Sequence, residues 1–559
     1  MPTLRDKLAD FLRQLSTGTE RAGADPKAEC PSPTSATATF MQRYLNGEGL
    51  PKQPEIVHSK SCYDLPNRDI APLSKRILAA YTGPSGGLTG VNKGPHRALT
   101  VTDQVDFIDD DSLCGSNENL ASRYLDRSGG TPKAKVPTSL SSSNSEGPRV
   151  ADTACVTGEE AETATEEIAG ICNWNQPAEF AYGIATTLYE CHPVTKENAG
   201  EPIADAFAIC VRENSAVMAL ADGVNWGDKS CLAARCAVHG CMDYLNRALY
   251  REGGTIETTQ EVFVCLLRSF QAAHSLILQE QGMLTTLCAA VTVQLQGSDQ
   301  YVVCVCNVGD SLAYVYNQQH GVREITLGSH DIHSMRDMRD ALGALGPVDG
   351  QNPELNNLTV SMTVVQPGDI LFLTSDGISD NFDPVVGKFA IAKRSRKDGT
   401  TNTQQPPLPL PEVEAHQRHA LTLLRMQDLL QQGLYQGDGA CSSAEDLCER
   451  MVDFATKLTA AKRRILEDPE LYAADSAPGE DARRRRHRAG PRLAMVPGKL
   501  DHASLVAYQV GRGSSNARCR RRQGTDVYDG QEDRANRNVP STPGEPDDYP
   551  DNLPYETTI

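Results

Sequence analysis

The hydrophobic pattern of the chain has two short apolar runs that both end in Asp-Gly, at residues 217–223 and 370–377. Apolar residues at consecutive positions predict strands that are buried on both faces. The glycine after each aspartate allows a sharp turn, because it has no Cβ to clash with the backbone. We therefore expect the two strands to lie side by side, with Asp222 and Asp376 at one rim of a sheet.

From about residue 172 onwards, the apolar periodicity predicts an α+β fold. Helical spacing predicts helices at 229–250, 259–279, 415–435 and 443–466. Strands are expected at 182–189, 205–211, 217–221, 286–295, 301–307, 312–316, 358–365, 370–374 and 502–508. The turn at 212–215 predicts a hairpin, which would bring Asp205 close to Asp222.

The segments outside this region are polar and rich in Ser, Thr, Gly and Pro. We predict that residues 1–170 are mostly disordered, with a short amphipathic helix at 4–15 that docks on the body or on a partner. Apolar islands at 40–45 and 76–81 are interpreted as short helices or partner-binding segments. Residues 171–510 form the predicted folded domain, with insertions near 393–411 and 467–497, and residues 511–559 a disordered tail.

Composition and charge narrow the function classes. A net charge of -19 argues against a nucleic-acid binder, which needs basic surface. We expect no membrane span and no signal peptide, because the chain has no apolar run of about 18 residues and no apolar core at its start. The expectation is a soluble protein of the cytoplasm or nucleus that is not secreted. The 17 cysteines are interpreted as reduced core thiols.

Several aspartates stand at the ends of predicted strands, which indicates candidate metal chemistry. Besides Asp222 and Asp376, these are Asp205, Asp310 in the turn 307–311, and Asp501 before the last strand. Neighbouring carboxylates repel each other unless a proton or a cation lies between them. Oxygen ligands of this kind suit Mg²⁺ or Mn²⁺. A single aspartate at a strand end is usually a turn former, so the metal hypothesis depends on the whole set.

Five short motifs, taken in chain order, resemble those of the metal-dependent Ser/Thr protein phosphatases of type 2C, the PPM family. They are Ile-Ala-Asp-Ala at 203–206, Ala-Asp-Gly-Val at 221–224, Asn-Val-Gly-Asp-Ser at 307–311, Thr-Ser-Asp-Gly-Ile-Ser-Asp at 374–380 and Leu-Asp-His-Ala-Ser at 500–504. The resemblance runs from about residue 181 to 510. It implies two packed antiparallel β-sheets with helices outside, an α-β-β-α sandwich.

The resemblance also implies roles for individual residues in binding two Mg²⁺ or Mn²⁺ ions. Asp222 would bridge the two ions, helped by the carbonyl group of Gly223. Asp376 and Asp501 would bind the first ion. Asp205 would hold metal-bound water, so that the implied catalytic residues are Asp205, Asp222 and Asp376.

A looser third ion is implied at Asp310 and Asp380. The implied reaction is hydrolysis of phosphoserine or phosphothreonine in a phosphoprotein by water that the ions activate, without a covalent intermediate. The expected enzyme is therefore a protein Ser/Thr phosphatase.

The chain departs from the family pattern at the substrate side of the site. The family's Glu before the first Asp is Ala204, and its phosphate-binding Arg four residues before that Asp is replaced by Glu201, next to Gly200. Val224 and His502 stand where the family usually has His and Asn. Two functions stay open: an active phosphatase, and a catalytically impaired pseudophosphatase that serves as a regulatory binding or scaffold module.

Three further features have open interpretations. The basic run at 483–488 predicts a nuclear localisation signal, a patch for an acidic partner, or a solvated loop. His330 and His333 show no metal-ligand spacing and are interpreted as ordinary histidines. The terminal Thr557-Thr558-Ile559 fits a carboxylate motif for a PDZ-type partner, with a chance match as the alternative.

Overall fold

The computed structural model describes residues 54–91, 167–251, 253–334, 341–393, 410–435, 437–473 and 482–512. All of them belong to one compact unit, which lies within residues 1–514. The predicted helix at 4–15, the apolar island at 40–45, most of the insertion near 393–411, the tail from residue 513 and the C-terminal motif lie outside the described residues.

The larger sheet has eight antiparallel strands in the order β1-β13-β8-β7-β6-β5-β2-β3. Its strands are β1 (Ile56–Ser59), β2 (Ile77–Gly83), β3 (Asn175–Gln176), β5 (Asp205–Arg212), β6 (Ser215–Asp222), β7 (Leu287–Gln294), β8 (Tyr301–Val308) and β13 (Thr359–Val365).

The smaller sheet has five antiparallel strands in the order β10-β9-β14-β17-β4. Its strands are β4 (Ala181–Thr187), β9 (Leu312–Asn317), β10 (Gly321–Glu324), β14 (Ile370–Thr374) and β17 (His502–Gln509). Two small two-stranded sheets are formed by β11 (Ala344–Asp349) with β12 (Asn352–Glu354), and by β15 (Ile391–Ala392) with β16 (Glu412–Val413).

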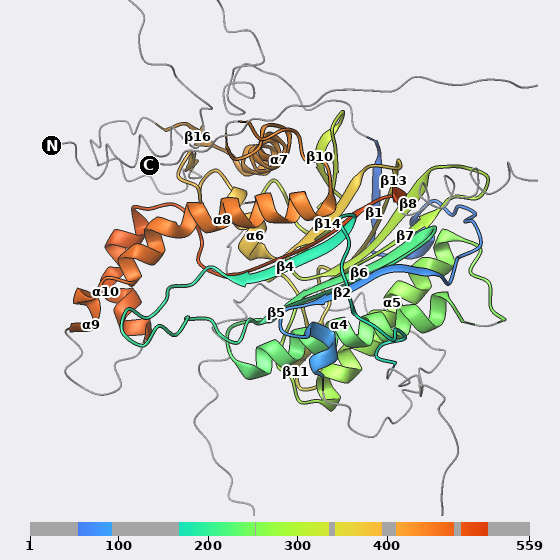
Figure 1. Ribbon diagram of the computed structural model, residues 1–559, viewed down its shortest axis with the longest axis horizontal. Coiled ribbons are helices and arrows are strands. Elements are labelled where there is room, and N and C mark those ends of the chain that lie inside the picture. Colours follow the sequence, from blue (N-terminus) through green and yellow to red (C-terminus); the bar gives the residue numbers. More distant parts are fainter. Residues whose placement is uncertain are drawn as a thin grey trace, which may run out of the picture. The chain divides into compact units, whose positions relative to one another are not determined.

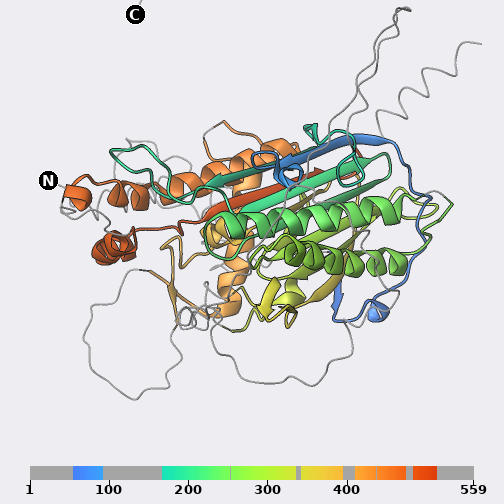
Figure 2. The same cartoon turned by 90° about the horizontal axis from the view of Figure 1, so that it is seen from below.

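Helices cover the outer faces of both large sheets (Figure 1). The eight-stranded sheet is covered by α4 (Asp228–Leu249) and α5 (Thr259–Gln279), which Figure 2 shows running alongside each other. The five-stranded sheet is covered by α6 (Asp376–Phe382), α7 (Ala415–Gln432) and α8 (Ala444–Leu466). The remaining helices are α9 (Glu470–Ala473), α10 (Ala482–Ala494) and the 3-10 turns η1 (Cys62–Asp64), η2 (Gly87–Gly90) and η3 (Leu327–Ser329).

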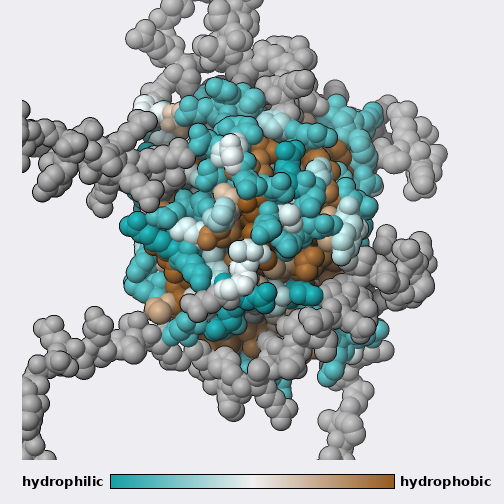
Figure 3. All heavy atoms as spheres, turned by 90° about the vertical axis from the view of Figure 1, so that its right-hand side faces the viewer, coloured by the Kyte–Doolittle hydropathy of each residue, from teal (hydrophilic) through white to brown (hydrophobic). Residues whose placement is uncertain are grey.

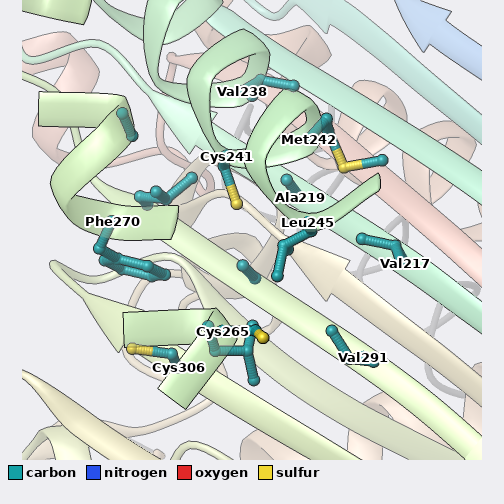
Figure 4. Packing of buried hydrophobic residues seen from close by; sticks show 14 of the residues in the cluster. Val217, Ala219, Val238, Cys241, Met242, Leu245, Cys265, Phe270, Val291 and Cys306 are labelled. Carbon is teal, nitrogen blue, oxygen red and sulfur yellow. The ribbon is translucent and has the colours of Figure 1, made fainter. Parts of the chain in front are cut away.

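Alternate residues of the central strands pack in different layers. On β6, Val217 and Ala219 pack against α4 and α5, as Figure 4 shows, whereas Met218 and Leu220 pack between the two sheets. This period of two is the expected result for strands covered on both faces, and it explains the continuous apolar runs. The structure thereby confirms the predicted α+β sandwich with its α-β-β-α layers.

Helix α5 is long and apolar enough, by length and composition alone, to cross a membrane. Its apolar residues, among them Phe263, Leu266 and Phe270, are instead buried in the core cluster that α5 shares with α4 and the sheet. Figure 3 shows a face of the molecule on which hydrophilic side chains predominate and hydrophobic ones appear only in patches. The hydropathy of α5 is therefore explained by its place in the interior.

Cysteines fill much of this interior, as predicted. Each cysteine that the structure describes is a free thiol, and all of them except Cys172 and Cys191 are buried. Cys241 and Cys306 lie in the cluster between α4, α5 and the sheet (Figure 4). Burial raises the pKa of the Cys241 thiol to about 12, so this thiol stays protonated and unreactive at neutral pH.

The prediction that the N-terminal region is mostly disordered is wrong for residues 54–91. The apolar island at 76–81 is not a short helix but belongs to β2, which pairs with β5, and β1 pairs with β13. The island was hard to interpret because its partner strand lies more than 120 residues further along the chain. A short strand flanked by polar sequence shows no periodicity that distinguishes it from a helical turn.

The second predicted insertion, near 467–497, contains helices. A solvated loop, one of the three interpretations of the basic run at 483–488, is therefore wrong. The basic run lies in α10 (Ala482–Ala494). The helix escaped prediction because its composition is strongly polar, so it has no apolar stripe to reveal a period of 3.6.

Candidate metal centre

The sequence suggested that the two Asp-Gly strands lie side by side, but the structure places them in different sheets. β6 belongs to the eight-stranded sheet and β14 to the five-stranded sheet. Their aspartates nevertheless meet, because both strands end at the same end of the sandwich, and the charges of Asp205, Asp376 and Asp501 act on Asp222. The carboxylates therefore gather across the gap between the sheets. The predicted hairpin is confirmed, with Asp205 directly opposite Asp222.

Gly223 is needed where the chain leaves β6. Its amide donates a hydrogen bond to the carbonyl of Ala204 at 3.1 Å. A Cβ at this position would lie 2.4 Å from the carbonyl oxygen of Ser230, in the first turn of α4. A second contact fixes the backbone of Asp222, whose amide donates to the hydroxyl of Thr286 at 3.0 Å.

Asp376 and Asp380 come from one short helix rather than from a strand. Helix α6 begins at Asp376, and a spacing of four residues places both carboxylates on the same face. Gly377 lets this helix lie against β17, because a Cβ there would be 1.8 Å from the carbonyl oxygen of His502. This close approach brings Asp501, the residue just before β17, to the same place.

Lys499 occupies the centre of these three carboxylates. Its ammonium group donates to Asp376 Oδ2, to Asp380 Oδ2 at 3.0 Å and lies 3.1 Å from Asp501 Oδ2. Burial alone would lower the pKa of Lys499, but the attraction of the three carboxylates raises it well above its ordinary value. The lysine is therefore a permanent internal cation in this half of the site.

The backbone at Lys499 is held in place by a buried amide side chain. Asn381 Oδ1 accepts from the amide of Lys499 at 2.8 Å, and Asn381 Nδ2 donates to its carbonyl at 3.0 Å. The same Nδ2 also donates to the carbonyl of Gly377 at 2.7 Å. The position of the lysine is therefore built into the contact between α6 and the segment that leads to β17.

The other half of the site is formed by Asp205 and Asp222. Asp205 is fully buried, and neither of its carboxylate oxygens has a hydrogen-bond partner among the described residues. Burial raises the pKa of Asp205 to about 6, against the lowering effect of His502 and of the nearby Ser504 and Ser375 hydroxyls. Burial also raises the pKa of Asp222 well above its ordinary value, and Asp205 and Asp376 add to this by charge repulsion. Such uncompensated carboxylates fit a divalent cation.

Asp310 lies at the edge of the group. Its loop is held by Asn357, whose side chain accepts from the amide of Gly309 at 3.0 Å and donates to its carbonyl at 2.8 Å. Asp310 is close enough to raise the pKa of Asp222. Asp380, its expected partner at a third ion, is bound to Lys499, so a third ion shared by Asp310 and Asp380 stays a prediction.

The substrate side of the site is built differently from the pattern that the sequence resembles. His502 Nε2 lies 2.5 Å from the carbonyl oxygen of Gly200, and so ties down the loop where a phosphate-binding arginine was expected. Tyr189 donates from its hydroxyl to Asp501 Oδ1 at 3.0 Å and accepts from the indole of Trp226 at 2.8 Å. Trp226 is 42% exposed. An aromatic wall therefore borders the carboxylates.

The structure thus brings together most of the predicted site residues and adds one that sequence reasoning missed. The members of the group are Asp205, Asp222, Gly223, Asp376, Asp380 and Asp501, with Asp310 at its edge. The missed residue is Lys499. Its only signal in the sequence is a basic side chain two positions before Asp501, directly before the motif at 500–504.

Comparisons with known proteins agree with the motifs. A family model described as Protein phosphatase 2C matches residues 195–397. A PP2C-like domain-containing protein of Drosophila melanogaster is 36% identical, and the match covers 92% of this chain and 96% of the relative.

Solved structures give weaker likenesses. The Ser/Thr phosphatase Stp1 of Staphylococcus aureus is 13% identical, with 59% of this chain and 94% of that chain covered and a TM-score of 0.30. The catalytic domain of the Ser/Thr phosphatase PstP, solved with two manganese ions, is 15% identical, with 59% and 98% covered and a TM-score of 0.28. On the strength of the Drosophila relative and the family model, the chain belongs to the protein phosphatase 2C family, as a PP2C-like member.

Proposed function

We propose that this PP2C-like domain is a catalytically impaired pseudophosphatase that keeps one divalent cation site and serves as a regulatory binding module. The observation that carries the proposal is the position of Lys499, whose ammonium group contacts Asp376, Asp380 and Asp501. Two of these, Asp376 and Asp501, are the carboxylates that the family resemblance assigns to the first metal ion. The lysine takes the place of that ion in neutralising them.

An ammonium group replaces the charge of a metal ion but not its chemistry. A divalent cation is a Lewis acid that lowers the pKa of a bound water and offsets charge on a phosphoryl group. An ammonium has half the charge, donates hydrogen bonds only, and offers no coordination position for water. A site with Lys499 in this place therefore orders its carboxylates without activating a nucleophile there.

The half of the site around Asp205 and Asp222 fits one Mg²⁺ or Mn²⁺ ion. The unpartnered oxygens of Asp205 and the repulsion at Asp222 support this assignment, and the carbonyl of Gly223 follows directly in the chain. An ion here would compensate the buried charge and stabilise the folded domain. The loss of a phosphate-binding arginine, with Glu201 in its place, also favours binding over hydrolysis.

The second candidate function is an active metal-dependent Ser/Thr phosphatase that acts on phosphoproteins. The presence of every acidic residue of the motifs favours it. In this alternative, Lys499, whose side chain is 22% exposed, leaves the carboxylates when two ions bind and contacts the phosphate in place of the missing arginine.

Hydrolysis of a phosphothreonine peptide by the full-length chain, with and without Mn²⁺, separates the two functions. We expect no Mn²⁺-dependent turnover by the wild type above the level of its Asp376→Asn variant. Wild-type turnover that requires Mn²⁺ and disappears in Asp376→Asn would overturn the proposal and establish the phosphatase.

A further inference from the structure

We propose that Glu324, His330 and His419 form a second metal site that takes Zn²⁺ or a similar borderline cation, distinct from the carboxylate centre. The inference is independent of the proposed function. It also revises the interpretation of His330 as an ordinary histidine.

The three side chains come from separate parts of the smaller sheet and its cover. Glu324 is the last residue of β10, and His330 follows η3. His419 lies in the second turn of α7, about 90 residues further along the chain. No spacing in the sequence reveals such a set, because the fold alone brings its members together.

Both imidazoles face the same carboxylate. His330 Nε2 lies 2.6 Å from Glu324 Oε1, and His419 Nε2 lies 2.7 Å from Glu324 Oε2. One ligand atom from each residue can be chosen so that all three lie within 4.8 Å of one another. Two histidines and one carboxylate are the three protein ligands of several zinc sites that keep a fourth position open. Imidazole nitrogens favour Zn²⁺ over Mg²⁺, which prefers oxygen, and each Nε2 releases its proton to solvent when it binds the ion.

The carboxylate is buried and oriented, as a metal ligand needs to be. The Glu324 side chain is only 2% exposed, against 14% for His330 and 19% for His419. Thr326 donates from its hydroxyl to Glu324 Oε1 at 3.2 Å and accepts from the amide of Ala313 at 3.1 Å. Groups of this kind, which hold a ligand without touching the ion, set its orientation.

A small cavity of about 100 Å³ lies beside the three residues. Ser379 and Asp380 of α6 line it as well, together with the first turns of α7. The space is sufficient for water as a fourth ligand. The site is thus open on one side, unlike a closed structural zinc site.

The same two segments provide a matched control pair. The rings of His333 and His416 are 5.9 Å apart, the same separation as the rings of His330 and His419. The carboxylate near His416 is that of Glu414, whose side chain is 48% exposed and lies 3.7 Å away. The control pair therefore has the histidines and their spacing but not the buried carboxylate.

The test is a Zn²⁺ titration of the full-length chain by calorimetry, together with the visible spectrum of the Co²⁺-substituted protein. We expect one tightly bound Zn²⁺, with a Co²⁺ spectrum that lacks the intense near-ultraviolet bands of thiolate ligands. His330→Gln and His419→Gln keep a donor to Glu324 and should each weaken Zn²⁺ binding by ~10-fold or more. The variant Asp222→Asn, which damages the carboxylate centre, should leave this Zn²⁺ binding unchanged. The double variant His333→Gln with His416→Gln should leave it unchanged as well.

The proposal is overturned if the wild type binds no Zn²⁺, if thiolate bands appear, or if the control pair weakens binding as much as His330→Gln. A urea denaturation curve of each variant shows whether it is folded. If both glutamine variants prove unfolded, the Co²⁺ spectrum of the wild type decides, because nitrogen and oxygen ligands without thiolate are the required result.

Discussion

At the scale of single residues, Asp205 is the clearest case of a side chain kept at a cost in stability. It is fully buried, and its carboxylate oxygens have no hydrogen-bond partner among the described residues. A buried polar group without a partner costs on the order of 1–3 kcal/mol. Such a cost is typical of a functional site, where a ligand completes the arrangement.

The variant Asp205→Asn should therefore be more stable than the wild type when metal is removed by a chelator. We expect a gain of about 1–3 kcal/mol at pH 7.5, because the amide carries no charge. The measurement is urea denaturation of both proteins with a chelator present. With Mn²⁺ in excess, the difference in the free energy of unfolding between the two proteins should shrink or reverse, because only the wild type has the Asp205 carboxylate to bind the ion.

The pH dependence of the metal-free wild type follows from the same residue. The folded-state pKa of Asp205 is raised to about 6, above the ordinary value of about 3.9 for an unfolded chain. Between these values the folded state binds more protons than the unfolded state, so this residue makes stability fall as pH rises from about 4 to above 6. Urea denaturation across this range should show a weaker fall for Asp205→Asn, and equal slopes would contradict the assignment.

The hydrogen bonds that hold the backbone at Lys499 can be tested through Asn381, which makes three hydrogen bonds to backbone groups of α6 and of Lys499. Asn381→Ala leaves these buried groups without partners and should lower the free energy of unfolding by about 1–3 kcal/mol. Asn356→Ala removes an exposed hydrogen bond to Glu354 and should change it by less than about 0.5 kcal/mol. If Asn381→Ala lowers the free energy of unfolding no more than Asn356→Ala does, the hydrogen bonds of Asn381 do not stabilise the fold.

At the scale of elements, the sequence predicted what local periodicity can encode. α5 was expected at 259–279 and is observed at Thr259–Gln279, because its apolar stripe marks it clearly, and the structure adds a capping box at Thr258. β2 was missed because its partner β5 is remote in sequence. The short helix α6 was read only as the residues after a strand, since one or two turns show no period.

The corrected role of residues 54–91 leads to a prediction at this scale. Leu88 is fully buried in the cluster beneath α4, so Leu88→Ala should lower the free energy of unfolding by about 2–5 kcal/mol. Tyr63 in the same segment is 70% exposed, and Tyr63→Ala should have an effect within about 0.5 kcal/mol. Urea denaturation that gives no loss for Leu88→Ala would contradict the packing of this segment on the domain.

At the scale of the whole molecule, the sequence predicted the acidic residues of the site but not the balance of charge among them. The motif order was enough to group Asp222, Asp376 and Asp501, because each stands in a recognisable local pattern. The role of Lys499 depends on the close packing of α6 against β17 at Gly377. The Glu324 cluster depends likewise on α7 lying beside β10. Contacts between remote segments of this kind have no local signature.

If Lys499 stands in for one metal ion, the number of Mn²⁺ ions that the protein binds depends on this lysine. The titration compares the full-length chain with its Lys499→Ser variant, both carrying His330→Gln so that the second proposed site does not contribute. We expect one Mn²⁺ for the protein with Lys499 and two for the variant, because the serine leaves Asp376 and Asp501 without a cation. Two tightly bound Mn²⁺ ions in the protein that retains Lys499 would contradict it.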